Sequence, residues 1–153
     1  MKPKVILLVE DNPSDEALTV RALTKAGVTN QVVVARDGAE ALDYLFCTGV
    51  FTERDPSDQP SVVLMDLSLP KVGGLDAIAR IRADTNTQLI PVVILTSSDE
   101  ERDRLKGYAT GANSFVRKPV EFNEFASAVR QIGLYWVILN ELPPANKRAQ
   151  DES

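Results

Sequence analysis

Acidic, hydroxyl and ammonium side chains stand directly after the apolar runs of this sequence. Glu10 and Asp11 follow the run ILLV, and Asp66 follows VVLM. The hydroxyl of Thr96 follows VVIL, and the ammonium of Lys118 follows SFVR. A carboxylate beside an apolar segment is costly unless a proton, a cation or hydrogen bonds compensate its charge. Three neighbouring carboxylates would also repel one another, so they must hold protons or share a positive ion.

The residue types available favour a hard divalent cation. All the candidate ligands are oxygens, and Mg²⁺, with Mn²⁺ as a possible substitute, fits such a set better than zinc. The sequence contains no histidine, which excludes a His-ligated zinc site, a His-based triad and a phosphohistidine relay within this chain. With the metal bound, Asp66 can attack a phosphoryl group and form an aspartyl phosphate. Lys118 would neutralise the phosphoryl oxygens, and Thr96 would donate a hydrogen bond to them.

Each of these residues also has a purely structural interpretation. The acid pair fits a solvated strand end, and Asp66 fits a turn. Thr96 and Ser97 can lead into a helix cap at Ser98, and Lys118 can be a surface lysine. Charged or hydroxyl groups after four separate strands favour the functional interpretation.

The elements that must position these groups alternate between strand and helix. Helix starts are indicated by Asn12-Pro13 and by the capping spacing of Asp37 with Glu40 and of Ser98 with Glu101, and helix ends by Gly27 and Gly111. The nearly continuous apolar strands are Val5–Val9, Gln31–Ala35, Val62–Met65, Val92–Leu95 and Ser114–Arg117. Such alternation predicts one doubly wound α/β domain with a parallel sheet, and ligands bind beyond the carboxyl ends of its strands.

Composition limits the classes of function. With 153 residues the chain suits one domain with its own core. The formal net charge is −5 and no Lys/Arg block stands out, which argues against a nucleic-acid binder. No segment is long and apolar enough to span a membrane. The one cysteine, Cys47, excludes an internal disulfide, fits a reducing cytoplasm, and is expected to be a small core residue.

Two segments depart from the alternation of elements. Residues 47–61, CTGVFTERDPSDQPS, are polar and contain proline, which predicts an extended surface loop whose role stays open. One interpretation of this loop is a tolerated insertion. After Leu139 the sequence NELPPANKRAQDES is typical of a frayed tail.

The order and spacing of four features resemble the receiver domain of two-component response regulators, the family that includes the chemotaxis regulator. The features are the acid pair, the apolar strand ending in Asp, the Thr after the fourth strand and the Lys-Pro after the fifth. The resemblance covers Lys4 to Val137, so residues 1–137 would form the receiver and residues 138–153 a C-terminal extension. It implies a five-stranded flavodoxin-like (CheY-like) fold with strand order 2-1-3-4-5.

The resemblance also implies roles for single residues. Glu10, Asp11 and Asp66, with the backbone carbonyl of Ser68, would bind Mg²⁺. Asp66 would accept a phosphoryl group from a partner histidine kinase, a phosphotransfer protein or a small acyl phosphate, and Thr96 and Lys118 would contact it.

Two further roles concern the fifth strand and its end. Lys118 and Pro119 match a cis peptide bond of the family. Phe115 matches the switch aromatic, although it also fits a plain buried strand residue. Because Phe lacks the hydroxyl of the commoner Tyr, switching at this position would rest on packing alone.

More narrowly, the chain resembles single-domain receivers paired with bacterial and cyanobacterial phytochrome kinases. The shared features are the long loop before the third strand, the phrase VILTSSDEERD, and Tyr135 and Trp136 followed by ELPP. Ser68, Val72 and Gly73 depart from the polar or charged residues that are more usual there, which affects details of that loop and not the chemistry.

Two helical segments suggest how a signal could leave the domain. The segment 99–110 has few apolar residues and Gly107 inside, which fits either an element that moves or a solvated surface helix. Phe122, Phe125, Val129, Ile132 and Trp136 form an apolar stripe suited to the core. The apolar residues 134–139 extend beyond that stripe, and we expect a homodimer formed by the fourth helix, fifth strand, fifth helix and C-terminal extension. Alternatively, the extension folds back onto its own domain.

Three other functions are weighed against a stand-alone phosphoacceptor. A haloacid-dehalogenase-type phosphatase would carry a second Asp two residues after the nucleophile, where this chain has Ser68. A transcription factor would need a longer segment after the receiver. A scaffold receiver that works without phosphorylation would not need the intact site. We therefore expect no enzyme acting on outside substrates, but a response regulator that signals through protein contacts.

Overall fold

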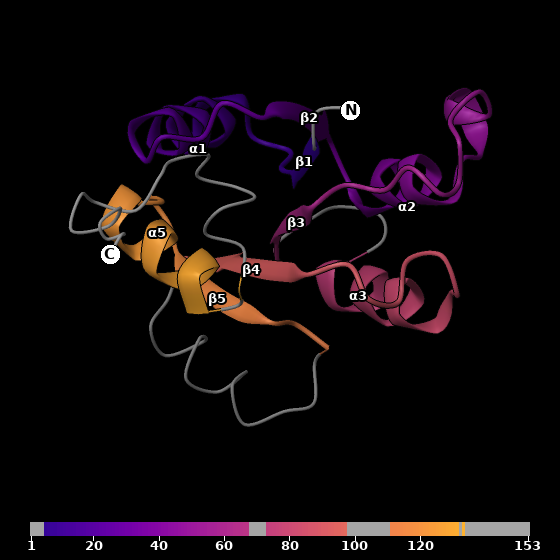
Figure 1. Cartoon of the computed structure of the whole chain (residues 1–153). Helices are drawn as coiled ribbons and strands as arrows, with labels where there is room; N and C mark the ends of the chain where they lie inside the picture. Colours follow the sequence, from indigo (N-terminus) through magenta and orange to yellow (C-terminus); the bar gives the residue numbers. More distant parts are fainter. Residues whose placement is uncertain (1–4, 68–72, 98–110, 132, 134–153) are drawn as a thin grey trace.

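The computed structural model describes residues 5–67, 73–97, 111–131 and 133. Five strands form one parallel sheet with helices on both faces (Figure 1). The strands, in the spatial order β2-β1-β3-β4-β5, are β1 (Val5–Val9), β2 (Gln31–Ala35), β3 (Val62–Asp66), β4 (Val92–Thr96) and β5 (Ser114–Arg117). The helices are α1 (Pro13–Lys25), α2 (Gly38–Phe46), the 3-10 helix η1 (Gly49–Phe51), α3 (Gly74–Ala83) and α5 (Phe122–Gln131). The predicted fold class and strand order are confirmed, and β3 and β4 each extend one residue further than predicted.

Alternate residues of the strands pack into two separate cores. Leu8 and Leu64 pack with α1 and α5, which lie together on one face of the sheet in Figure 1. Leu7 and Met65 pack with α2 and α3 on the opposite face. This arrangement follows from the period of two in a strand, and it explains why the strand sequences are apolar at nearly every position.

The first turn of α1 is fixed beside the end of β1. The side-chain oxygen of Asn12 accepts hydrogen bonds from the backbone N–H groups of Ser14 (2.8 Å) and Asp15 (3.1 Å), and Pro13 occupies the first helical position. The predicted cap at α2 also forms, because Asp37 accepts the backbone N–H of Glu40 at 2.8 Å. The Asn12 cap therefore helps to determine which residues of α1 face the end of the sheet.

The segment 47–61 is a mostly exposed surface loop, as its polarity predicts, and part of it is ordered against α2. It contains η1 and packs on α2, where Phe51 contacts the Tyr44 ring edge-on at a centroid distance of 5.2 Å. The Arg54 guanidinium lies 3.8 Å from the centroid of the same ring and donates to the backbone carbonyls of Tyr44 and Asp58. Arg54 and Phe51 thus attach this polar segment to the Tyr44 ring of α2, and Gln59 adds a hydrogen bond to the Leu45 carbonyl at 2.9 Å.

Two residues predicted to lie in the core do not. Cys47 is half-buried and ends α2 in the left-handed conformation, with a φ of 58°. Phe122 is 43% exposed because it is the first residue of α5, whereas Phe125 and Val129 of the same stripe are fully buried. Ile132, Trp136, the segment 99–110 and the apolar residues 134–139 lie outside the described residues.

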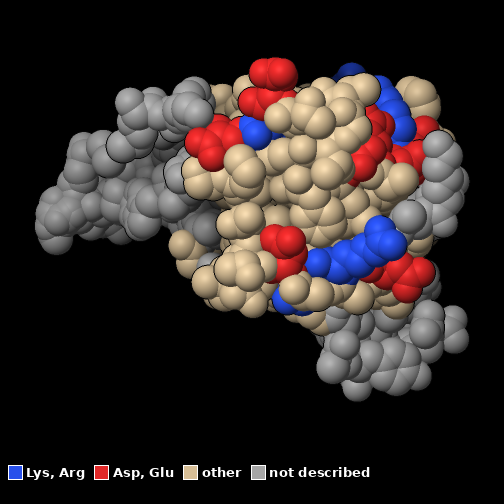
Figure 2. Space-filling view, turned by 90° about the vertical axis from the view of Figure 1, so that its right-hand side faces the viewer, with Lys and Arg blue, Asp and Glu red and all other residues tan. Residues whose placement is uncertain are grey.

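The surface on the side of α2 and α3 carries charges of both signs (Figure 2). Acidic and basic side chains occur there in small mixed groups over the described residues, rather than as one continuous field. In the part of the chain that the structure describes, no helix combines the length and hydropathy needed to cross a bilayer.

Arg82 connects α3 to the turns that precede β4 and β5. Its guanidinium donates to the side-chain oxygen of Asn113 at 2.8 Å and to the backbone carbonyls of Gln88 (2.9 Å), Ile90 (2.7 Å) and Gly111 (2.8 Å). The same Asn113 oxygen accepts the first backbone N–H of β4 at 2.8 Å. Burial lowers the pKa of Arg82. This network holds the starts of β4 and β5 against α3 and so helps to set where both strands end.

We predict that Arg82→Gln lowers the free energy of unfolding by about 2 kcal/mol, because it removes four hydrogen bonds from a charged donor and leaves the partly buried carbonyl of Ile90 without it. Urea unfolding monitored by circular dichroism measures the change. Arg80→Gln removes the same charge from an exposed position of α3 and should shift stability by no more than about 0.5 kcal/mol. Equal losses for the two variants would contradict a structural role for the Arg82 network.

Candidate functional site

Three of the predicted site residues lie on the same side of the carboxyl end of the sheet. Glu10, Asp66 and Lys118 each stand two residues beyond a residue of the α1/α5 core, namely Leu8, Leu64 and Val116. Because strand side chains alternate between faces, all three are directed toward the α1/α5 side. Backbone hydrogen bonds from Glu10 N to Ala35 O (2.9 Å) and from Lys118 N to Thr96 O (2.7 Å) continue the ladders and fix both positions.

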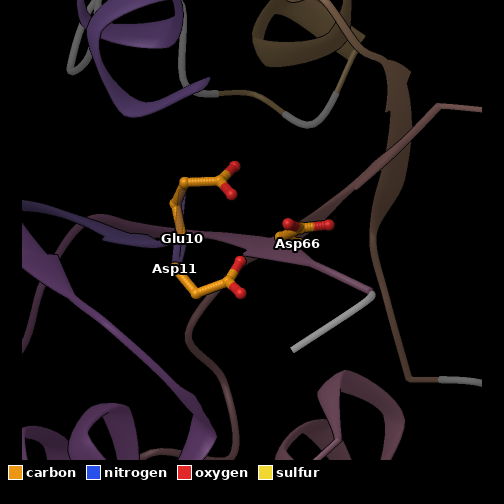
Figure 3. A group of neighbouring side chains, drawn as sticks. All are labelled: Glu10, Asp11 and Asp66. Atoms are coloured by element: carbon orange, nitrogen blue, oxygen red, sulfur yellow. The ribbon is translucent and has the colours of Figure 1, made fainter. Parts of the chain in front are cut away.

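The three predicted carboxylates form one acid cluster. Glu10, Asp11 and Asp66 each offer an oxygen, and these oxygens lie within 4.8 Å of one another. In Figure 3 Glu10 and Asp11 leave the end of β1 on opposite sides, and both carboxylates extend toward the side where Asp66 lies. Glu10 is fully buried and Asp66 nearly so, while Asp11 is exposed. Such an arrangement of oxygen ligands, closed on one side and open on the other, suits a divalent cation that keeps several waters.

The ammonium of Lys118 lies among three carboxylates. Its Nζ is 3.1 Å from Asp66 Oδ2, 3.2 Å from Glu10 Oε1 and 3.1 Å from Asp15 Oδ2. The Lys118 side chain is 12% exposed, and burial by itself lowers its pKa. Hydrogen bonds and charge from Asp66, Asp15 and Glu10 outweigh that effect, so the pKa of Lys118 is raised and the amine stays charged. The peptide bond that follows, between Lys118 and Pro119, is cis.

The pKa of Glu10 is raised although the Lys118 ammonium lies beside it. Burial, together with a hydrogen bond to Asp66 and the charge of Asp66, raises the pKa of Glu10 to about 7, although Lys118 acts in the opposite direction. Near neutral pH Glu10 therefore takes up a proton much more readily than an ordinary glutamate does. A divalent cation bound by the acid cluster would replace that proton, which is the second way to relieve the same repulsion.

Thr96 and Phe115 lie on the other side of the sheet. Thr96 is the last residue of β4, is 2% exposed, and directly follows Leu95, the register partner of Asp66. It stands two residues beyond Ile94 of the α2/α3 core, and Phe115 pairs with Ile94 and packs on that core. The structure thus brings Thr96 to the same edge of the sheet as Asp66. Phe115 lies beside Ile94, two residues further from that edge than Thr96. Ser68 lies outside the described residues.

Asp15 is a site residue that the sequence reasoning missed. An acid in the first turn of a helix is readily explained by the helix dipole, and Asp15 has no neighbouring motif. The available signal was its helical spacing from Thr19, Ala22 and Leu23, which are the buried residues of α1. That spacing places Asp15 at the head of the stripe facing the sheet, next to Lys118.

Comparison with known proteins identifies the family. The sequence model of the response regulator receiver domain matches residues 6–130. The chain belongs to this family. The matched range includes Glu10, Asp11, Asp66, Thr96 and Lys118, the five groups that the sheet brings to its carboxyl end. The receiver assignment therefore covers the whole described site and does not favour a phosphatase of the haloacid dehalogenase type.

The receiver domain is similar to several known regulators. The solved structure of the bacteriophytochrome response regulator AtBRR is 52% identical, with a TM-score of 0.83 over 92% of this chain and 100% of that chain. The response regulator Rcp1 of Synechocystis sp. (strain ATCC 27184 / PCC 6803 / Kazusa) is 34% identical over 94% of this chain and 95% of its own length. The crystal structure of its Mn(2+)-bound form has a TM-score of 0.68 and 32% identity, over 88% of this chain and 95% of that one. The probable methanogenesis regulatory protein FilR2 of Methanothrix harundinacea (strain 6Ac) is 38% identical over 92% of this chain and 88% of its own length.

The pKa of Glu10 leads to a prediction about pH. Proton and cation compete for the same carboxylate, so Mg²⁺ affinity should be low below pH 7, rise through the pKa of about 7, and level off above it. For a single competing proton the increase from pH 6 to pH 8 is about tenfold. Isothermal titration calorimetry in buffers of different ionisation enthalpy measures both the affinity and the proton released.

Glu10→Gln provides the matched control, because it keeps the shape of the side chain and removes the titrating group. Its Mg²⁺ affinity should be weaker than that of the wild type at pH 8 and nearly independent of pH between 6 and 8. A wild-type affinity that stays constant over this range would contradict the assignment of the raised pKa to Glu10.

Proposed function

We propose that this receiver domain is a phosphoacceptor in a two-component system, with Asp66 as the residue that takes the phosphoryl group from a histidine kinase. The observation that carries the proposal is the position of the Asp66 carboxylate. It is buried at the end of β3, 3.1 Å from the Lys118 ammonium, and shares the acid cluster with Glu10 and Asp11. This combination supplies a nucleophile, a fixed positive charge and a place for a divalent cation.

The transfer itself needs little beyond positioning. A carboxylate oxygen of Asp66 forms a bond to phosphorus while the bond between phosphorus and the kinase histidine nitrogen breaks. The electron pair stays on that nitrogen, which takes up a proton. Lys118 can direct an N–H toward the phosphoryl oxygens as charge gathers there, and Thr96 can donate its hydroxyl from the other side of the sheet.

We assign the metal site to Glu10, Asp11 and Asp66, with the backbone carbonyl of Ser68 as a further ligand. Mg²⁺ is the proposed resident ion, with Mn²⁺ as a substitute, and the Mn(2+)-bound form of Rcp1 supports that range. When bound, the ion would neutralise phosphoryl charge as a Lewis acid. The raised pKa of Glu10 supports the fit, because burial and the neighbouring Asp66 disfavour its negative charge and a bound cation would favour it.

The proposed output is a change in protein contacts and not turnover of an outside substrate. The residue two positions after Asp66 is Ser68, which cannot replace the general acid of a phosphatase. Thr96 and Phe115 are the proposed switch, in which movement of the hydroxyl toward the phosphoryl group changes the packing of the half-buried ring on the α2/α3 core. The expected homodimer stays a prediction, because its fourth helix and C-terminal extension lie outside the described residues.

We further propose a phytochrome histidine kinase as the phosphate donor, with the exchange taking place in the cytoplasm. The support is the similarity to AtBRR, which is named a bacteriophytochrome response regulator. The similarity to FilR2 shows that related sequences occur under other regulatory names, so the donor must be tested directly.

The central prediction concerns Asp66. In Mg²⁺ and acetyl phosphate, the intact mass of the wild-type protein should increase by one phosphoryl group, and chelation of the metal should prevent the increase. Asp66→Asn should show no increase, because an amide oxygen is a poor nucleophile and the variant also lacks a metal ligand. Asp76→Asn, at an exposed position in the first turn of α3, should be modified like the wild type. Labelling of Asp66→Asn at the wild-type rate would contradict the proposal.

The surface beside Lys118 offers a docking site for the kinase. A groove of about 290 Å³ lies between α1 and the residues that follow Lys118, and its apolar lining includes Leu18, Pro119, Val120 and Phe122. Leu18 and Phe122 are 46% and 43% exposed and line the same groove, and an exposed apolar patch of this kind is typical of an interface. A donor that delivers a phosphoryl group to Asp66 must cover this edge of the sheet, so we propose that the kinase's phosphohistidine domain occupies the groove.

Leu18→Asp should slow phosphotransfer from a phytochrome kinase by about tenfold or more, because a charge replaces an apolar interface contact. Modification by acetyl phosphate, which needs no docking surface, should stay within about twofold of the wild-type rate. Leu89→Asp is the matched control, since Leu89 is 89% exposed and lies before β4, at the opposite end of the strand from Thr96. Equal effects of the two variants on kinase transfer would rule out the groove as the docking site.

A further inference from the structure

Asp15 contacts the ammonium of Lys118 as closely as the phosphoacceptor does. Asp15 Oδ2 and Asp66 Oδ2 each lie 3.1 Å from the Lys118 Nζ, and Glu10 Oε1 lies 3.2 Å from it. An ammonium has three N–H donors, and here it has three carboxylate partners. We propose that Asp15 is a positioning residue that keeps Lys118 directed toward Asp66 once a divalent cation occupies the acid cluster, an inference that rests on the proposed phosphoacceptor function.

The fold fixes where the Asp15 carboxylate can be. Asn12 caps α1 and accepts the backbone N–H of Asp15 at 3.1 Å, so the first turn is held at the end of β1. Thr19, one turn later on the same stripe, is 2% exposed. Asp15 therefore lies at the open end of the buried face of α1, above the edge where the α1/α5 side of β1, β3 and β5 meets solvent.

The three partners of Lys118 are not equivalent when a cation binds. Glu10 and Asp66 belong to the acid cluster, so a cation would neutralise part of their charge and weaken their attraction for the ammonium. Asp15 is not part of that cluster and keeps its charge. It is then the carboxylate partner of Lys118 that the metal leaves unchanged.

The partial exposure of Asp15 suits this role. Its side chain is 38% exposed, compared with 0% for Glu10 and 5% for Asp66. Solvent weakens an exposed ion pair, so Asp15 can hold one N–H of Lys118 without preventing the others from turning to the phosphoryl oxygens. A fully buried carboxylate in the same place would hold the ammonium more strongly and compete with the incoming phosphoryl group.

The simpler explanation for Asp15 is its place in the first turn of a helix, where any acid favours the helix dipole. Glu16 separates the two explanations. It occupies the same turn and carries the same charge, but its carboxylate pairs with Arg36 and not with Lys118. Asp15→Asn and Glu16→Gln therefore remove equal charge from the same turn, and one of them removes a contact to Lys118.

The test measures Lys118 itself as well as the rate. The ¹⁵N–¹H resonance of the Lys118 ammonium, assigned with Lys118→Arg, should be visible by NMR in the Mg²⁺-saturated wild type, because held ammonium protons exchange slowly with water. Asp15→Asn should lose this resonance and slow modification by acetyl phosphate at saturating Mg²⁺ by about tenfold. Glu16→Gln should keep the resonance and a rate within about twofold, and Asp15→Glu should restore the resonance at least in part.

The outcomes separate the inference from the function on which it rests. A wild type that acetyl phosphate cannot modify would end the proposed function, while the resonance would still show whether Asp15 holds Lys118. Persistence of both the resonance and the rate in Asp15→Asn would overturn the inference. Equal slowing in Asp15→Asn and Glu16→Gln would also overturn it and assign the effect to the helix. Thermal unfolding of each variant confirms that the folded protein is compared.

Discussion

The structure depends on an imbalance of charge at one edge of a parallel sheet. Three carboxylates end β1 and β3, a fourth comes from α1, and one ammonium lies among them. Lys118 compensates part of this charge, but burial and the neighbouring Asp66 still raise the pKa of Glu10. A site that retains an excess of negative charge attracts a divalent cation, and a cation bound there prepares the same place for a phosphoryl group. The repulsion among these carboxylates is therefore the starting point of the proposed chemistry.

The apolar strands strengthen this repulsion among the carboxylates, because they hold the charged groups in place and keep water away from them. Leu8, Leu64 and Val116 bury the α1/α5 face up to the last residues before the site. The ladder hydrogen bonds continue through Glu10 and Lys118, so both backbones are held at the end of the sheet. Low local polarity strengthens both repulsion and ion pairing compared with water. The fold thus contributes a rigid position and a poorly solvated environment, and the reacting groups contribute the rest.

Local pattern and chain order were enough to predict most of the sheet and its acids. A strand period, a cap such as Asn12-Pro13 and an acid after an apolar run are all visible within a few residues of sequence. Asp15 was missed because its role depends on which face of α1 meets β5, a contact between residues far apart in the chain. The packing of Arg54 on Tyr44 was missed for a related reason, since a polar loop shows no periodicity that would place its arginine. Phe122 followed the helical stripe in sequence but lies at the helix start, where the stripe leaves the core.

The alternation of strand side chains also gives the proposed signal a route across the sheet. Glu10, Asp66 and Lys118 face the α1/α5 side, where the groove proposed as the docking site lies. Thr96 and Phe115 belong to the opposite side and pack with the α2/α3 core. A phosphoryl group on Asp66 would be contacted by Lys118 from one side and by Thr96 from the other, so a single charge change acts on both cores. Kinase binding and the proposed switch can then occupy different faces of a domain only three layers thick. This is possible because Asp66 at the end of β3 and Thr96 at the end of the neighbouring β4 face opposite sides of the sheet.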